Sequence, residues 1–325
     1  MSAIKTLSVI IEWENAKLSE LERAERMLSQ LGRQMEEAAK KRGFTAELIV
    51  LYDSDAIEEN VPATAVSKNI PADRWPGAIR IVPAAHQRYY EQKNTGAQLS
   101  NADVLVFLDS DVVPEDGWLE GLLSAMDDPK VQFVGGETYH AIDTFYDRIF
   151  AGFWTFNVRR KPHGIYTWKN FYANNFAVRR EVFLQNRFPD APSYRGQCSA
   201  LARLLKQRGI TIYRQSAAFV SHPPPIGART FMARAICQGY DAVYWKGLSP
   251  LQRLRRSNPI SSLLRMLRLW VSVVVRVTTR AGAIGLGPLG WLAAIGAGFA
   301  YYFFKFWGEV VAFFAPGIIK NNLAV

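Results

Sequence analysis

Residues 102–118 read Ala102-Asp-Val-Leu-Val-Phe-Leu-Asp-Ser-Asp-Val-Val-Pro-Glu-Asp-Gly-Trp118. The apolar run at 104–108 is short and unbroken, which is typical of a strand buried on both faces of a sheet. It ends in Asp109-Ser110-Asp111, so two carboxylates follow the strand directly. Ligands of open α/β sheets bind at this edge, and paired carboxylates there favour Mg²⁺ or Mn²⁺, which bind phosphate oxygens in turn. The alternative is an Asx turn that caps a helix predicted at 118–126.

The chain alternates between strand and helix patterns up to residue 220. This alternation predicts an α/β fold in which a mostly parallel sheet is flanked by helices. Apolar and β-branched runs predict strands at 6–12, 46–52, 79–83, 131–134, 171–178 and 210–220. Helical spacing of apolar residues predicts further helices at 18–41, 89–100, 140–160 and 199–208.

The net charge of +10 is concentrated at the C-terminal end. Residues 242–325 contain ten Lys or Arg and one acidic residue, Glu309, whereas residues 1–241 contain 29 basic and 28 acidic residues. The main domain lacks the basic excess typical of nucleic-acid binding, so we expect no nucleic-acid partner. Cys198 and Cys237 match no disulfide or metal-ligand pattern, which favours a reducing compartment. The first six residues lack signal-peptide anatomy, so we expect the main domain in the cytoplasm.

Three other segments place polar groups where ligands bind. Asp53-Ser54-Asp55 ends a predicted strand and is an alternative to residues 109–111 as the metal site, but its strand is less apolar. Alternatively, the Asp53 carboxylate accepts hydrogen bonds from a nucleotide base. Gly135-Gly136 allows close backbone approach to a ligand, and Glu137 follows at the same edge. His222 precedes three prolines and is either a ligand or part of a rigid exit from the domain.

The order of these motifs resembles glycosyltransferase family 2, whose members have the nucleotide-diphospho-sugar transferase (GT-A) fold. The similarity extends over residues 6–245. Each motif is weak alone, but their shared order and spacing are specific. The segments that carry the resemblance are 8–11 followed by Asn15, 47–53, 93–97, 109–111 and 174–180.

The resemblance implies single-displacement sugar transfer with inversion at the anomeric carbon, assisted by Mg²⁺ or Mn²⁺. Asp111 would bind the metal with Asp109 in support, and His222 is a further candidate ligand. Lys93 would help hold the diphosphate. The implied nucleotide-sugar site consists of Glu12, Asn15, Asp53, Lys93, Asn94, Gly96, Asp109 and Asn175.

Two departures from the family pattern affect the mechanism. The opening Pro-Thr-Tyr-Asn is replaced by Glu12-Trp13-Glu14-Asn15, and the late Glu-Asp pair, whose Asp is the general base, is replaced by Gln197-Cys198. Transfer to a hydroxyl needs a group that accepts its proton. Glu137 is the first candidate, followed by Asp190 and Glu181; alternatively, the acceptor is a phosphate or carboxylate, which needs no base.

The C-terminal tail carries membrane signals. In 260–280 the arginines lie on one side of a predicted helix and apolar residues cover the rest. This pattern predicts an amphipathic helix that lies at an anionic leaflet. The alternative is a helix that packs on the main domain and exposes its arginine face to solvent. Residues 281–304 contain no charge and are long enough to cross a bilayer, while 306–319 form a second, shorter or re-entrant segment. The arginines before the span place the main domain on the cytoplasmic side.

We therefore predict a GT-A domain at 1–245 and, at 246–325, a basic amphipathic helix with membrane-anchoring segments at the cytoplasmic membrane. The expected function is transfer from a nucleotide-diphospho-sugar to a lipid-linked or saccharide acceptor in cell-envelope polysaccharide or glycolipid assembly. One alternative is a degenerate protein that binds a sugar nucleotide or a partner without turnover. A processive polysaccharide synthase is disfavoured because the Gln-x-x-Arg-Trp motif is missing.

Overall fold

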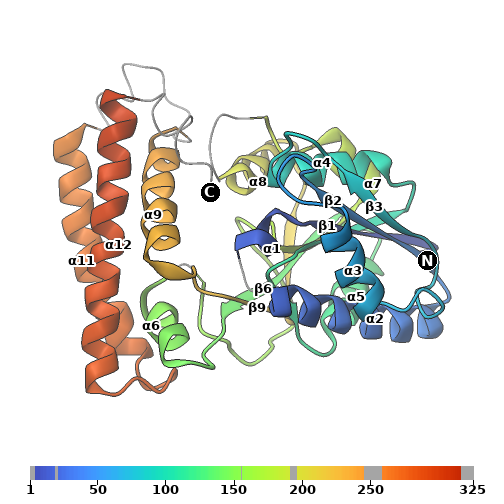
Figure 1. Cartoon of the computed structure of the whole chain (residues 1–325), viewed down its shortest axis with the longest axis horizontal. Coiled ribbons are helices and arrows are strands. Elements are labelled where there is room, and N and C mark those ends of the chain that lie inside the picture. The colour runs from blue at the N-terminus through green and yellow to red at the C-terminus, as the bar shows by residue number, and fades with distance from the viewer. Residues whose placement is uncertain (1–3, 19–20, 155, 191–195, 245–257, 316–325) are drawn as a thin grey trace. The chain divides into compact units, whose positions relative to one another are not determined.

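The computed structural model of the protein describes residues 4–18, 21–154, 156–190, 196–244 and 258–315. Within these ranges one sheet has the strand order β3-β2-β1-β4-β8-β6-β9-β5, with β7 paired to β9 (Figure 1). Strands β1 to β4 are parallel where they pair, and β8 is antiparallel to β4. The strands are β1 Thr6–Glu12, β2 Thr45–Tyr52, β3 Ile79–Pro83, β4 Val104–Asp109, β5 Val113–Pro114, β6 Phe133–His140, β7 Ile165–Thr167, β8 Asn175–Arg179 and β9 Ile212–His222.

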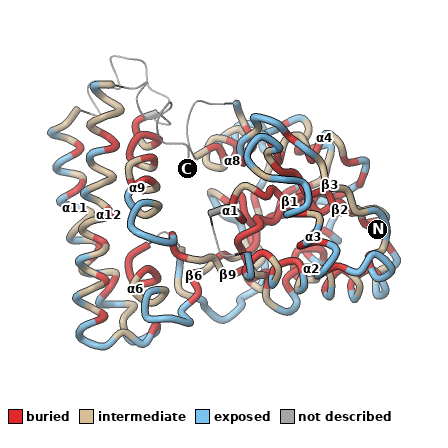
Figure 2. The backbone as a smooth tube through the Cα atoms, in the orientation of Figure 1, coloured by how far each residue is buried: buried red, intermediate tan, exposed pale blue. Residues whose placement is uncertain are grey.

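The predicted α/β architecture with a mostly parallel sheet is confirmed. Every residue of β4 is buried, as its uninterrupted apolar sequence predicts. Its neighbour β1 is buried along nearly all of its length (Figure 2). Glu12 is the register partner of Asp109, so the last residues of β1 and β4 are neighbours. Two carboxylates therefore meet at the carboxyl edge of the sheet.

Helices cover both faces of this sheet and bury one apolar core on each. One core contains residues of α2, α3 and α5, and the other contains residues of α4, α7 and α8. The helices of this part of the chain are α1 Glu14–Leu18, α2 Leu21–Arg42, α3 Asn60–Asn69, α4 Tyr89–Leu99, α5 Trp118–Met126, α7 Arg180–Gln185 and α8 Gln197–Gln207.

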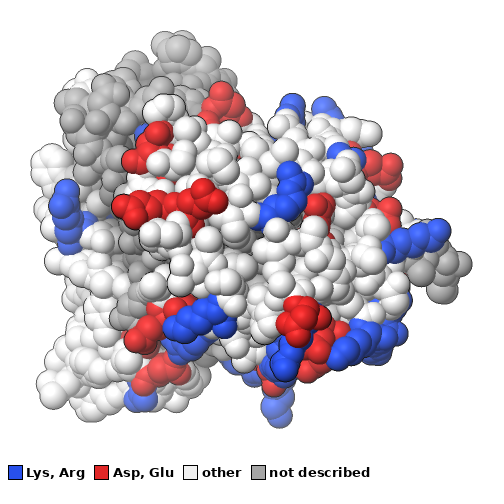
Figure 3. All heavy atoms as spheres, turned by 45° about the vertical axis from the view of Figure 1, so that its right-hand side comes forward, with Lys and Arg blue, Asp and Glu red and all other residues white. Residues whose placement is uncertain are grey.

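Ion pairs join α2 to α5 on the surface. Arg42 donates to Glu120 at 2.8 and 2.9 Å and to Asp127 at 2.9 and 3.0 Å. The hydrogen bond from Arg42 is the largest influence that lowers the pKa of Glu120 to about 2. On the face drawn in Figure 3, Lys and Arg side chains lie among Asp and Glu instead of forming one basic patch.

The region predicted as a helix at 140–160 differs in the structure. Strand β6 continues to His140, and the helix α6 runs only from Phe145 to Phe153. Thr144 sets the start of α6, because its side chain accepts from the backbone N–H of Asp147 and the Asp147 carboxylate accepts from the backbone of Thr144. The predicted strand at 131–134 overlaps only the first two residues of the longer β6.

A second compact unit is built from α6, α9, α11 and α12. Helices α11 and α12 are antiparallel neighbours, since Trp270 Nε1 donates to Phe299 O at 3.1 Å and Trp291 Nε1 donates to Thr278 Oγ1 at 3.0 Å. Their shared core with α6 and α9 is aromatic. The remaining bounds are α9 Gly227–Tyr244, α11 Pro259–Arg280 and α12 Pro288–Phe314.

At the C-terminal end, one predicted helix is confirmed and two predicted segments form a single helix. Helix α11 matches the prediction at 260–280, whereas 281–304 and 306–319 contribute to one continuous helix, α12. It begins at Pro288 because proline suits the first helical turn. Residues 316–319 and the predicted domain boundary at 245–246 lie outside the described residues. Among the described helices, α12 alone is long and apolar enough to cross a membrane.

Candidate active site

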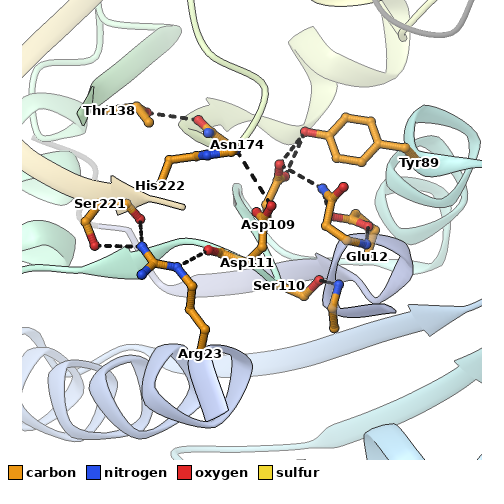
Figure 4. A network of polar contacts seen from close by, with 12 residues as sticks. Glu12, Arg23, Tyr89, Asp109, Ser110, Asp111, Thr138, Asn174, Ser221 and His222 are labelled. Carbon is orange, nitrogen blue, oxygen red and sulfur yellow. Dashed lines mark hydrogen bonds and ion pairs between the residues drawn. The ribbon is translucent and has the colours of Figure 1, made fainter. Parts of the chain in front are cut away.

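Two carboxyl groups, on Glu12 and Asp109, lie side by side at the carboxyl ends of β1 and β4 (Figure 4). Both residues are buried, with exposed fractions of 0% and 3%. Lys93 of α4 is also fully buried and places its Nζ 2.8 Å from Asp109 Oδ1. A buried charge is stable only when it is paired and hydrogen-bonded, and Lys93 supplies the opposite charge for Asp109.

Both carboxylate oxygens of Asp109 accept hydrogen bonds from the protein. The Tyr89 hydroxyl lies 2.8 and 2.7 Å from Oδ1 and Oδ2, and Asn15 Nδ2 donates to Oδ2 at 3.2 Å. Asn15 also donates to Glu12, from Nδ2 at 2.8 Å and from its backbone N–H at 3.1 Å. Asn15 therefore connects the two carboxyl groups, and Asp109 is held by protein donors.

The electrostatics of this cluster affect Glu12 most strongly. Burial and then the neighbouring charge of Asp109 raise the pKa of Glu12 well above its usual range, and the Lys93 ammonium opposes that increase. One cation thus faces two carboxyl groups. The protein interior accordingly favours the protonated form of Glu12.

Asp111 and His222 form the second half of the site. The Nε2 atom of His222 lies 3.7 Å from Asp111 Oδ2, and their side chains are 12% and 2% exposed. Arg23 of α2 contacts the backbone of both segments: Nε donates to Asp111 O at 2.6 Å, and Nη2 donates to Ser221 O at 2.7 Å (Figure 4). Because one guanidinium holds both backbones, Arg23 fixes the spacing between the loop after β4 and the end of β9.

The chemistry of Asp111 and His222 fits a divalent cation that takes its remaining ligands from a substrate or water. Carboxylate oxygen suits Mg²⁺ and Mn²⁺, and imidazole nitrogen is a common ligand of transition metals, so the pair fits a divalent metal. In the described part of the chain, no three or more His, Cys, Asp or Glu side chains form a group that could hold a metal. The oxygens of Asp109 are engaged by Lys93 and Tyr89.

Glu137, the first candidate base, lies in a different polar cluster. Its Oε1 accepts from the Tyr166 hydroxyl at 2.5 Å, and its Oε2 lies 3.6 Å from Arg214. Burial, with the hydrogen bond to Glu137, raises the pKa of Tyr166 to about 12. The Arg214 guanidinium lies over the rings of Trp168 and Tyr172, at 5.0 and 4.7 Å from their centroids. The candidate base is therefore held by a phenol and a buried guanidinium.

The other positions considered for proton transfer differ in exposure. Asp190 and Glu181 are exposed. Gln197 is buried at the first position of α8, and Cys198 beside it is partly buried. The amide and the thiol thus lie together at the start of α8.

Asn174 and Asn175 have different environments. The Asn175 side chain donates to the carbonyls of Glu137 and Ala218 at 3.1 and 3.0 Å and accepts from Trp118 Nε1 at 2.7 Å. These contacts give Asn175 a structural function between strands. Asn174 accepts from Thr138 and lies beside Asp109 and His222 in Figure 4, so it is the asparagine nearer the candidate site.

The remaining predicted nucleotide-site residues lie near the same sheet edge or on α4. Asp53 accepts from the backbone N–H groups of Asp55 and His86, both at 3.2 Å. Asn94 exchanges two hydrogen bonds with the backbone of Phe188. A Cβ on Gly96 would lie 2.5 Å from Ile10 Cγ2, so this glycine allows α4 to pack on β1. The structure gives each a structural contact, and their nucleotide roles stay predictions.

Two residues of the site were not found by sequence analysis. Tyr89 precedes Lys93 by four residues on α4, so the two share a helix face, and this spacing could have identified it. Arg23 resembles any other polar residue of an amphipathic surface helix. Its partners, Asp111 and Ser221, are distant in the sequence, so no local pattern indicates its contacts.

Comparisons with known proteins agree with this geometry. The profile described as "Glycosyl transferase family 2" matches residues 26–187, from within α2 to just beyond α7. The solved mannosyltransferase PcManGT from Pyrobaculum calidifontis, in complex with GDP-Man and Mn²⁺, is 17% identical with a TM-score of 0.54, covering 95% of this chain and 87% of that chain. This likeness shows a shared fold.

A crystal structure of GalNAc-T7 with UDP, GalNAc and Mn²⁺ is 13% identical with a TM-score of 0.48, covering 76% of this chain and 49% of that chain, which is too distant to support an argument. No curated protein matches the chain. The family match spans the helices and strands that carry Lys93, Asp109 and Asp111, and the sheet has the mixed, mostly parallel order of the GT-A fold. The chain therefore belongs to glycosyltransferase family 2 and is a glycosyltransferase with a GT-A fold.

Proposed function

We propose that this glycosyltransferase transfers a sugar from a nucleotide-diphospho-sugar with the assistance of a divalent metal. The observation that carries the proposal is the Asp111–His222 pair at the carboxyl edge of the sheet, beside the buried Lys93–Asp109 pair. The ligands named for PcManGT, GDP-Man and Mn²⁺, support a donor and a metal of this kind. A carboxylate and an imidazole at one position suit a cation that also binds diphosphate oxygens.

In this mechanism the chain's residues bind and orient the reacting groups. Asp111 and His222 would hold the metal, which when bound stabilises the negative charge developing on the departing nucleoside diphosphate. Arg23 keeps the two ligands at a fixed spacing through its backbone contacts. Lys93 neutralises Asp109, which in turn orients Tyr89. The site is thus preorganised for charge stabilisation before a substrate binds.

Inversion by single displacement requires a proton acceptor when the sugar acceptor is a hydroxyl. Glu137 and Asp190 remain the two candidates in this proposal. Glu137 would act from within its contacts to Tyr166 and Arg214, whereas Asp190 is exposed. A phosphate or carboxylate acceptor would need neither base. Such an acceptor agrees with the presence of an amide and a thiol, instead of carboxylates, at Gln197 and Cys198.

The proposed acceptor is membrane-proximal, either a lipid-linked or a growing saccharide. Its support is α12, which is long and apolar enough to cross a bilayer. The arginines of α11 precede this helix in the sequence and favour a cytoplasmic location for the catalytic part. A role in cell-envelope polysaccharide or glycolipid assembly follows from this placement.

One observation favours a second function. Because Gln197 and Cys198 stand in place of carboxylates, the chain would be a non-catalytic protein that binds a sugar nucleotide or a partner. The two functions differ in a measurable way. The catalytic protein releases nucleoside diphosphate, and the non-catalytic one binds a donor without releasing it.

The test is a panel of uridine-, guanosine- and thymidine-linked sugars incubated with the detergent-purified full chain, with Mn²⁺ or Mg²⁺ and membrane lipid extract. Nucleoside diphosphate release is measured for the wild type and for Asp111→Asn. Asp116→Asn is the matched control, because Asp116 belongs to the same connection between β4 and α5 but its side chain is 79% exposed. Mn²⁺ binding by electron paramagnetic resonance gives a readout that is independent of turnover.

We expect release from one donor, abolished by chelation, reduced at least 100-fold in Asp111→Asn and unchanged in Asp116→Asn. We also expect weaker Mn²⁺ binding in Asp111→Asn alone. Donor binding without release supports the non-catalytic function. If no donor binds, or if Asp111→Asn retains full activity, the proposed site is incorrect. Glu137→Gln and Asp190→Asn, assayed with the identified acceptor, then separate the two candidate bases.

A further inference from the structure

The outward side of α11 is mainly apolar from Ile260 to Val275, and Arg268 is the exposed charged residue of this stretch. Its most exposed large apolar residues recur every three or four positions, which places them on one side of the helix. We call this set the outer stripe of α11. Its members and their exposed fractions are Ile260 72%, Leu264 62%, Leu267 44%, Val271 66% and Val275 58%.

The arginines of α11 point into the protein instead of towards the surroundings. Arg276 donates to Phe153 O at 2.6 Å, and Arg280 donates to Ala151 O at 3.0 Å. Arg265 pairs with the buried Glu309 of α12 at 2.6 Å. The helix predicted to present arginines to an anionic leaflet therefore has the opposite orientation, with these charged groups inside and its apolar residues outside. Arg268, at the edge of the outer stripe, is exposed.

Helix α12 shows the same inside-out distribution. Its exposed large side chains are all apolar or aromatic, and its acidic residue, Glu309, is 3% exposed. The exposed positions again recur at helical spacing. The outer stripe of α12 consists of Leu289 80%, Leu292 59%, Phe303 42%, Trp307 47% and Phe314 70% exposed.

Small residues form the inner contacts between these helices. A Cβ on Gly239 of α9 would lie 2.0 Å from Lys305 O of α12, and a Cβ on Gly308 would lie 2.0 Å from Ile236 O of α9. A Cβ on Gly298 would lie 2.6 Å from Val273 of α11. Glycine inside and large apolar residues outside is the arrangement of helices packed within lipid, where apolar side chains need no burial by protein.

We infer that the hydrocarbon of a lipid bilayer covers the outer stripes of both α11 and α12. The inference rests on the proposed function only in that α12 is taken as a membrane helix, and it adds α11 as a second lipid-facing helix that binds through apolar side chains. Both outer stripes lie on antiparallel neighbouring helices (Figure 1).

Charge placement favours lipid over a second protein as the covering partner. Protein interfaces have a polar rim around an apolar centre, whereas the outer stripe of α11 is apolar from its first turn to its fourth. Since Arg265, Arg276 and Arg280 are engaged inside, contact with lipid needs no anionic headgroup.

The test uses the full chain reconstituted in vesicles of phosphatidylcholine that carries a photoreactive diazirine on its acyl chain. After illumination, mass spectrometry locates the adducts. We expect adducts at Leu264, Val271 and Val275 of α11 and at Phe303 and Trp307 of α12. Their yield should change less than twofold when phosphatidylglycerol is added or when the salt concentration rises from 0.05 to about 0.5 M, because surface charge attraction is strongly screened over that range.

A pair of variants makes the result specific to the outer stripe. Leu264→Glu with Val271→Glu should lower the adduct yield on α11 at least fivefold, while Arg268→Gln should leave it unchanged. Adducts on α12 alone would overturn the inference and leave the membrane role of α12 intact. Adducts on neither helix would overturn both. Protection of α11 from the lipid adducts, together with a dimeric mass of the reconstituted protein, would assign the outer stripe to a second copy. A requirement for phosphatidylglycerol would assign it to arginine-led binding. Either result overturns the inference.

Discussion

Substituting Lys93 by methionine tests whether its ammonium is what allows Asp109 to be charged in the interior. Their side chains are 0% and 4% exposed, and no solvent replaces the lost cation. Removing one partner of a buried ion pair costs about 3–5 kcal/mol, because the remaining charge loses its partner but stays buried. The compact unit that contains the site comprises 1–139, 160–190 and 198–222. In a domain of about 150–250 residues each kcal/mol lowers the melting temperature by about 2–4 °C, so we expect Lys93→Met to lower it by roughly 6–20 °C.

The measurement is thermal unfolding of the full chain in detergent with EDTA, followed by circular dichroism. Adding Asp109→Asn to Lys93→Met should restore much of the loss, because it removes the unpaired charge. Lys68→Met is the matched control: Lys68 pairs with Glu25 at 2.9 Å but is 62% exposed, and surface pairs contribute about 0–1 kcal/mol. If Lys93→Met is as stable as Lys68→Met, or if the double variant is less stable than Lys93→Met, the reasoning is refuted.

Three further predictions concern other contacts of the structure. Arg23→Met removes the hydrogen bonds that tie Asp111 to β9, so Mn²⁺ binding by electron paramagnetic resonance should weaken about 10-fold or more. Because its pKa is raised, folded Glu12 keeps a proton that the unfolded chain releases above about pH 4.5. The free energy of unfolding should therefore fall as the pH rises from about 4.5 to the pKa of Glu12 in the folded protein. In urea denaturation with EDTA, Glu12→Gln should flatten this fall. Gly308→Ala places a Cβ 2.0 Å from a carbonyl of α9 and should lower the melting temperature more than Gly296→Ala, whose Cβ meets nothing within 4 Å.

Each of these predictions has an outcome that contradicts it. If Arg23→Met lowers the melting temperature but leaves the Mn²⁺ affinity unchanged, Arg23 stabilises the fold and has no role in metal binding. An identical pH slope in Glu12→Gln and wild type would show that other groups cause the slope. Equal melting temperatures for Gly308→Ala and Gly296→Ala would mean that α9 and α12 separate without cost.

The half of the site around Asp109 could be predicted from the sequence because its signals are local. An apolar run followed directly by Asp-Ser-Asp identifies a buried strand and its polar end within eight residues. For Asp111, sequence analysis named His222 as a further candidate ligand but did not indicate Arg23. Arg23 and His222 reach it from helices and strands far away in the chain, and only the packed sheet brings them together.

Helix α11 shows a different limit of sequence reasoning. The periodicity of 260–280 identified two sides of a helix, and the structure contains that helix. The same periodicity is produced whether the charged side faces solvent or the protein interior, because spacing determines the angle between two faces and not which face is outside. The paired glycines at 239 and 308 mark the inner side, but they are recognised only once α9 and α12 are known to touch.

The Arg23 contact to Ser221 joins residues 198 positions apart, and this separation affects how the protein matures during synthesis. Glu12, Lys93 and Asp109 are all translated within the first 109 residues, so their cluster can assemble early. His222 and Ser221 emerge from the ribosome more than a hundred residues later. A nascent chain stalled before residue 221 would thus contain the Lys93–Asp109 pair without the Asp111–His222 pair, and metal binding is expected to appear only after β9 has joined the sheet.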